Sequence, residues 1–132
     1  MEELKKWVKE ELTVTEVNEL SRHKETVKEL IRITSDGMIV FKVDSTKLSA
    51  KEIICVYMIG KVYAYVAGYV DEESVTNREL IGALNLPEGT IGRSLKELRD
   101  RKFIIAKKTG IHSILHNSIE EILKNVLEKL GK

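Results

Sequence analysis

The stretch Thr76-Asn-Arg-Glu-Leu-Ile-Gly-Ala-Leu-Asn-Leu-Pro-Glu-Gly-Thr-Ile-Gly-Arg-Ser-Leu-Lys-Glu-Leu-Arg-Asp-Arg-Lys-Phe-Ile104 decides the fold, because it contains two helical patterns in close succession. Thr76 and Glu79 have the spacing of a capping box, and apolar residues follow them at helical intervals. The segment 85–89 contains proline and glycine, which predict a tight turn. A second amphipathic pattern then covers residues 88–101. We therefore expect two short helices joined by a turn.

A β-hairpin is expected directly after the second helix. Phe103–Ala106 and Ile111–Leu115 are apolar runs of strand length, and the basic segment Lys107–Gly110 separates them with a glycine at its end. The order of elements is therefore helix, turn, helix and hairpin. In this order the second helix is presented outward.

The second helix separates apolar from polar side chains. Ile91, Leu95 and Leu98 cluster within a narrow arc and are expected to face the core. Arg93 and Lys96 lie on the opposite side. The whole chain has a net charge of only +1, but residues 78–116 contain eight Lys or Arg against four Asp or Glu. Positive charge concentrated on one helix and hairpin is typical of nucleic-acid binding.

Residues 49–115 resemble the winged helix-turn-helix domains of small archaeal and bacterial transcription regulators. The resemblance rests on the small residue Ala83 before the turn, on Leu86-Pro87 within it, and on Leu98-Arg-Asp-Arg-Lys102 at the end of the second helix. It implies dimeric binding to double-stranded DNA, with helix 88–101 in the major groove and a basic wing at residues 107–110.

The expected DNA contacts differ in their chemistry. Side chains at the front of the second helix could reach base edges, where arginine and lysine donate to guanine. Glycines there would let phosphate approach the backbone, and the remaining cations would contact phosphates. The expected set is Asn77, Arg78, Gly89, Thr90, Arg93, Lys96, Glu97, Arg99, Arg101, Lys107 and Lys108.

The rest of the chain predicts a mainly α-helical protein with a small β component. We expect residues 1–47 to form an N-terminal helical and β appendage, and residues 48–132 to form the winged helix domain with a C-terminal helix. The appendage resembles no regulator family. In it, apolar residues at helical spacing predict a helix over 2–12, with Leu4, Trp7, Val8 and Leu12 on one face.

A second N-terminal helix is expected from a cap at Thr15 to about Arg32, with a polar interruption over residues 21–26 that thins or breaks it. After the turn Ser35-Asp-Gly37, the run Met38–Val43 predicts a strand. Its partner could be Ile31–Thr34 or the wing hairpin.

The segment from Ser49 to about Val70 predicts a long helix that is apolar on all sides and begins with a capping box. Lys61 at its centre disfavours a membrane span and favours the buried helix of a soluble fold or of a dimer. Gly60, Ala64 and Gly68 form a row of small residues that would let another helix approach.

The C-terminal segment predicts a helix over residues 118–130 with a capping box formed by Ser118 and Glu121. Its apolar stripe is Ile119, Ile122, Leu123, Val126 and Leu130. Together with the central helix, this stripe favours a homodimer.

Other chemistry is disfavoured. A single cysteine, Cys55, excludes an internal disulfide and fits a cytoplasmic location, and the first residues do not form a signal peptide. His112 and His116 are too few for a metal site, and no catalytic or phosphate-binding motif is present, so neither a cofactor nor enzymatic activity is expected. Tyr57 and Lys61 belong to a row that could hold an anionic effector, although a snorkelling lysine or a dimer contact is favoured.

The sequence therefore predicts a DNA-binding transcription regulator. The alternative is a winged helix that serves as a protein-interaction module without specific DNA binding, with residues 1–47 as its docking arm.

Overall fold

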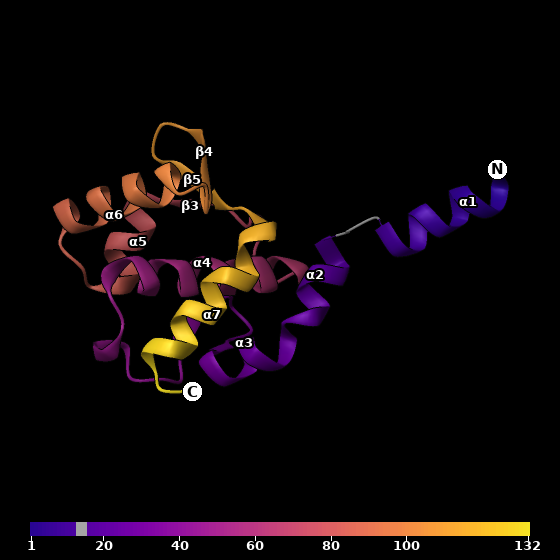
Figure 1. The fold of residues 1–132 in the computed structure, drawn as a ribbon. Coiled ribbons are helices and arrows are strands. Elements are labelled where there is room, and N and C mark those ends of the chain that lie inside the picture. The colour runs from indigo at the N-terminus through magenta and orange to yellow at the C-terminus, as the bar shows by residue number, and fades with distance from the viewer. Residues whose placement is uncertain (13–15) are drawn as a thin grey trace.

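The computed structural model describes residues 1–12 and 16–132, and it confirms a mainly helical fold with a small β component, at 61% helix and 13% strand. Figure 1 shows the arrangement of the elements. In chain order they are α1 (Glu2–Trp7), the π-helix η1 (Val8–Leu12), α2 (Glu16–Arg22), α3 (Lys24–Leu30), β1 (Ile31–Ile33), β2 (Ile39–Phe41), the 3-10 turn η2 (Ser45–Lys47), α4 (Ala50–Val66), β3 (Val75–Thr76), α5 (Asn77–Leu84), α6 (Glu88–Asp100), β4 (Ile104–Lys108), β5 (Ile111–Ile114), the 3-10 turn η3 (His116–Ser118) and α7 (Ile119–Lys129).

Helix α4 is the centre of the fold (Figure 1). It begins with the predicted capping box, in which the Ser49 side chain accepts from the backbone of Glu52 and Glu52 accepts from the backbone of Ser49. Its buried residues contact α5, α6, α7, the β1–β2 hairpin and β5, all within one chain. The apolar character of α4 is therefore satisfied without a second subunit. No helix in the described part of the chain has both the length and the apolar composition needed to cross a membrane.

Helix α4 ends at Val66, four residues before the predicted end. Gly68 adopts a φ of +80°, which favours glycine and cannot continue a right-handed helix. The small-residue row is also used differently from the expectation. A Cβ on Gly60 would lie 2.8 Å from Ile39 and 3.0 Å from Ile31, so the β1–β2 hairpin approaches α4 at this point, not another helix.

The N-terminal appendage contains a two-stranded antiparallel sheet. Strand β1 pairs with β2 in the register Ile31↔Phe41, so the nearer of the two expected partners is the correct one. The predicted helix breaks at His23, within the polar interruption, and it ends at Leu30 because Ile31 already belongs to β1. The predicted cap, Thr15, lies outside the described residues.

The first helical segment is exposed along its whole length. Residues Glu2–Trp7 form α1 and Val8–Leu12 continue as a π-helix, and none of them is buried. The predicted apolar face is therefore present in the sequence but is not covered by the rest of the described chain. Trp7 and Leu12, for example, are 50% and 61% exposed.

The predicted helix, turn, helix and hairpin are all present. Asn85 has a φ of 53° and ends α5, and α6 begins at Glu88. Strand β5 lies between β3 and β4 in a three-stranded antiparallel sheet.

Helix α7 packs against α4 and buries Ile119, Ile122, Leu123 and Val126 in the core. Its stripe therefore does not require a dimer either. The predicted capping box at Ser118 is wrong, because the Ser118 hydroxyl donates to the carbonyl of Lys102, 3.2 Å away.

Candidate nucleic-acid interface

Helix α6 is attached to the core by the face that the sequence predicted. Ile91, Leu95 and Leu98 are each 1% exposed, and α6 packs against α4 and α5. This burial fixes the orientation of α6. Because the apolar arc faces the core, Arg93 and Lys96 on the opposite arc are exposed.

The exposed front of α6 carries little side-chain bulk. A Cβ placed on Gly89 or on Gly92 would meet no atom within 4 Å. Both residues therefore lack a packing reason to be glycine, although glycine inside a helix costs roughly 1 kcal/mol relative to alanine.

The N-terminus of α6 has no side-chain cap. Pro87 occupies the cap position and its side chain accepts no hydrogen bond, so the first amide groups of the helix remain available to an external acceptor. Thr90, one of the expected contacts, is half-buried in this first turn. The start of α6 is thus a helix N-terminus without a side-chain cap, where free amide groups and the helix dipole favour a negative charge.

The hairpin side of α6 adds further positive charge. Arg99 and Lys102 line a shallow depression of about 340 Å³ together with Ile104, Ile105 and Ala106 of β4. Lys107 and Lys108 are exposed at the tip, where a β-bulge interrupts the pairing of β4 with β5. Lys102 was not among the expected contacts, although its position at the end of a basic run was a usable signal.

The start of α5 is tied to the hairpin through Asn77. His112 Nε2 lies 2.7 Å from Asn77 Oδ1, and the Asn77 backbone amide donates to the carbonyl of Gly110 at 3.2 Å. His112 is only 3% exposed, and burial, with a smaller contribution from the nearby Arg99, lowers the pKa of its imidazole. Neutral His112 therefore donates from Nε2, and the Asn77 oxygen is already occupied. Its neighbour Arg78 is exposed.

Two of the expected DNA contacts, Glu97 and Arg101, lie on the flank of α6 that faces α4. Glu97 forms an ion pair with Lys51 of α4 at 2.8 Å, and this hydrogen bond lowers the pKa of its carboxyl. The Arg101 guanidinium lies 4.5 Å from the centre of the Phe103 ring and lines a cleft beside Cys55. Both side chains therefore lie on the flank of α6 that faces α4. The sequence could not predict this, because Lys51 and Cys55 are distant along the chain.

A second lysine of α4 fixes the first helix of the pair. Glu79 Oε2 accepts from the Tyr57 hydroxyl at 2.6 Å and lies 3.1 Å from Lys61 Nζ. Burial, and then the hydrogen bond to Glu79, raises the pKa of Tyr57. Lys61 is thus committed to an internal carboxylate, and the tyrosine–lysine row does not form an anion site. Glu79 was expected only in a cap, where its backbone amide indeed donates to the Thr76 hydroxyl.

Most of the positive charge on the hairpin side lies outside the salt bridges of the described residues. Within residues 1–12 and 16–132, none of the following six forms a salt bridge: Arg78, Arg93, Lys96, Arg99, Lys107 and Lys108. Two carboxylates of the same region, Glu79 and Glu97, are paired with lysines of α4. The positive surplus of this region is therefore larger in the fold than the residue count suggests.

Two other side chains with potential reactivity, Cys55 and His116, are held within the fold. Burial raises the pKa of Cys55 to about 12, so its thiol stays protonated. His116 contacts Glu73 at 3.1 Å. Among the described residues, no three His, Cys, Asp or Glu side chains gather in a group that could hold a metal ion.

Comparison of the chain with protein-family models, curated proteins and solved structures gave no match.

Proposed function

We propose that the protein binds double-stranded DNA through α6 and the β4–β5 hairpin. The observation that carries this proposal is the set of six cations on α5, α6 and the hairpin, five of them exposed, that form no salt bridge in the described part of the chain. A phosphate backbone is the polyanion that such an arrangement fits.

The front of α6 is suited to the major groove. Arg93 and Lys96 project from the face opposite the core and could donate to guanine O6 and N7. Gly89 and Gly92 leave space for a close approach of DNA. Such an approach would explain why glycine occupies both positions, which internal packing does not explain. The uncapped first turn of α6 would accept a phosphate.

The flanking contacts are assigned to phosphates. Lys107 and Lys108 at the hairpin tip, and Arg78 at the start of α5, would fix the position of the protein on the duplex. Asn77 keeps its amide donor for DNA, while its oxygen accepts from His112. Glu97 and Arg101 are removed from the contact set because they face the opposite flank.

Regulation of transcription by a homodimer is the biological role that we propose for this binding. Two-fold symmetry would place two recognition helices about 34 Å apart on an inverted repeat. The burial of α4 and α7 within one chain gives no support for the dimer, so this part of the proposal rests on the resemblance alone. Light scattering at tens of micromolar protein would reject the dimer if it reports a monomer.

A protein-interaction module is the second candidate, and the exposed apolar residues of α1 and η1 favour it. Leu4, Trp7 and Leu12 are at least half exposed, which is unusual for side chains that share one helical face. This role predicts a stable protein partner and no affinity for DNA.

Fluorescence anisotropy with random-sequence duplex DNA distinguishes the two candidates. At about 50 mM salt we expect micromolar binding, and at about 200 mM salt we expect it to weaken by orders of magnitude because counterions are released from several phosphates. Absence of binding at the lower salt concentration would reject the DNA-binding proposal and favour the interaction module.

A further inference from the structure

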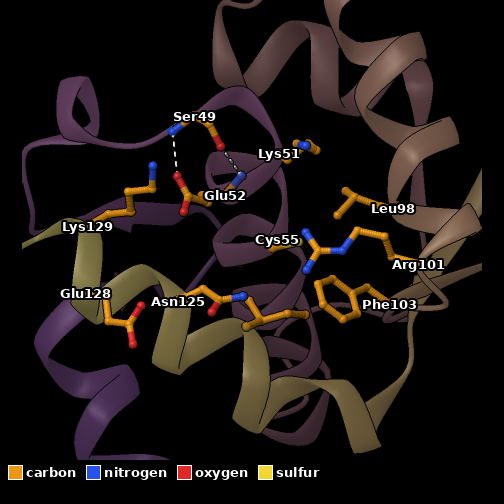
Figure 2. Close-up of a pocket in the computed structure, with 11 residues that line it drawn as sticks. Ser49, Lys51, Glu52, Cys55, Leu98, Arg101, Phe103, Asn125, Glu128 and Lys129 are labelled. Atoms are coloured by element: carbon orange, nitrogen blue, oxygen red, sulfur yellow. Dashed lines mark hydrogen bonds between the residues drawn. The ribbon is translucent and has the colours of Figure 1, made fainter.

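A cleft of about 450 Å³ lies between the start of α4, the end of α6 and α7 (Figure 2). Its volume is within the range of small-molecule sites in proteins. The inner wall is apolar and includes Cys55, Leu98, Phe103 and Ile122, which belong to the core. The cleft is on the flank of α6 that faces α4 and α7, and it takes no part in the proposed DNA contacts.

Arg101 is the most informative residue of this cleft. In Figure 2 its side chain extends from the end of α6 towards Cys55, with the Phe103 ring beside it. The guanidinium lies 4.5 Å from the ring centre and forms no salt bridge within residues 1–12 and 16–132. It is therefore oriented by an aromatic face while its donor edge has no carboxylate partner. A guanidinium held in this way is prepared for a planar anion that accepts two parallel hydrogen bonds.

The other charged groups of the cleft leave Arg101 available to a ligand. Lys51 is paired with Glu97 at 2.8 Å, Lys129 is exposed, and two carboxylates line the cleft. One of these carboxylates, Glu52, is engaged because its Oε1 accepts from the backbone amide of Ser49 at 2.8 Å. The other, Glu128, is exposed.

We propose that this cleft binds a small carboxylic acid with an apolar body. The carboxylate would accept a bidentate pair of hydrogen bonds from Arg101, and Lys129 would add attraction at longer range. The apolar body would pack on Leu98, Phe103 and Ile122. The carboxylate and the apolar body are both needed for binding, because the cleft offers an apolar wall and one oriented guanidinium. The proposal is independent of DNA binding.

Isothermal titration calorimetry with four defined probes tests the site on the full-length protein. The probes are benzoate and hexanoate, with the uncharged compounds benzamide and hexanol as matched controls. We expect saturable binding of at least one carboxylate with a Kd of about 1 mM or below, and at least about tenfold weaker binding of its uncharged counterpart. Backbone amide resonances of Cys55, Arg101 and Phe103 should shift during the same titration.

Three variants connect the binding to Arg101. Arg101→Gln should weaken the carboxylate at least about tenfold, and Arg101→Lys should weaken it as well because a single ammonium cannot form the bidentate pair. Lys124→Gln on the exposed face of α7 removes the same charge outside the cleft and should leave the affinity unchanged. A circular dichroism spectrum identifies any variant that fails to fold, and Arg101→Lys then carries the comparison.

The proposal is overturned if neither carboxylate saturates at up to about 10 mM. Equal binding of benzoate and benzamide, or of hexanoate and hexanol, would overturn it as well. Affinity that persists in the folded Arg101 variants would show that the guanidinium has no role in the cleft.

Discussion

Helices α4 and α6 use their cations in opposite ways. The two lysines of α4 pair with carboxylates of the helices α6 and α5, Lys51 with Glu97 and Lys61 with Glu79. The cations on the outer face of α6, Arg93 and Lys96, form no salt bridge in the described part of the chain. Both helices pack against each other in the same core.

This difference in pairing separates cations that stabilise the fold from cations that remain available to bind a ligand. A lysine whose partner lies within the chain contributes to stability, and its removal leaves a carboxylate uncompensated. An exposed arginine without a partner contributes little to stability, so its removal should be neutral for folding. The contrast therefore predicts that substitution of Lys61, whose ion pair is largely buried, changes stability, and that substitution of Arg93 and Lys96 changes binding.

The largest effect is expected for Arg93→Ala combined with Lys96→Ala. Removal of two groups that are proposed to contact base edges should weaken the affinity for duplex DNA about a hundredfold at low salt. The unfolding free energy should stay within about 0.5 kcal/mol of the wild-type value, because both side chains are exposed. Anisotropy and urea denaturation measure the two quantities.

Lys28→Ala combined with Lys124→Ala is the matched control, since these exposed lysines lie on α3 and α7. The control should retain nearly all of the DNA affinity. An equal loss in both double variants would mean that only the total charge matters, and the assignment of α6 would have to be abandoned.

The next effect concerns stability and the two lysines of α4. Lys61→Ala should lower the unfolding free energy by about 2–3 kcal/mol, because the side chains of Lys61 and Glu79 are only 11% and 27% exposed. Lys51→Ala is its control and should be nearly neutral, because the side chains of Lys51 and Glu97 are 37% and 55% exposed. Urea denaturation of both variants compares them, and a larger loss for Lys51→Ala would contradict the contrast between buried and exposed pairs.

Two glycine substitutions sharpen the comparison further. Gly60→Ala should lower the unfolding free energy by about 1–2 kcal/mol, since its Cβ would overlap Ile39 and Ile31. Gly92→Ala should raise it by about 0.5–1 kcal/mol, because the new methyl group meets no atom and alanine favours the helix. Thermal unfolding measures both shifts.

Gly92→Ala is also a test of binding, because it stabilises the fold while adding bulk to the front of α6. We expect its affinity for duplex DNA to fall although its stability rises. Unchanged affinity would show that DNA does not approach this part of the helix.

The smallest effect concerns the bond between the hairpin and α5. The pKa of His112 is below its ordinary value of 6.5, so the unfolded chain takes up a proton at this residue before the folded chain does. The contribution of His112 to stability is therefore complete above pH 6.5 and is lost as the pH falls from there through the folded pKa. Chemical denaturation between about pH 7 and 5 should reveal this loss in the wild type.

His112→Gln isolates this contribution, because glutamine can still donate to Asn77 but does not titrate in this range. The wild type should therefore lose more stability than the variant on acidification. Identical pH profiles for the two proteins would exclude a role for His112 in the loss.

Local patterns predicted the parts of the fold that depend on local interactions. The caps at Ser49 and Thr76 and the buried arc of α6 follow from residues within one or two helical turns, and all are present in the structure. The end of α4 and the cap at Ser118 were mispredicted. Gly68 breaks α4 through its own left-handed conformation, and Ser118 is drawn away by the distant carbonyl of Lys102.

The residues of the candidate site could be predicted from the sequence, but which of them lie on the outer face of α6 and which face α4 could not. Periodicity identified the exposed cations of α6, yet it could not show that Arg101 and Glu97 turn to the opposite flank. That division depends on Lys51 and Phe103, and the packing of α4 against α6 brings Lys51 into reach. Tertiary contacts of this kind leave no periodic signal in the sequence.

The most direct test of the proposed interface is a titration of isotope-labelled protein with a short DNA duplex, followed by backbone amide resonances. We expect shifts at the start of α6, at Arg78 and at the hairpin tip over residues 107–110, with little change around Arg101 and the cleft. Shifts confined to α1 and η1, or to the cleft, would contradict the proposed interface.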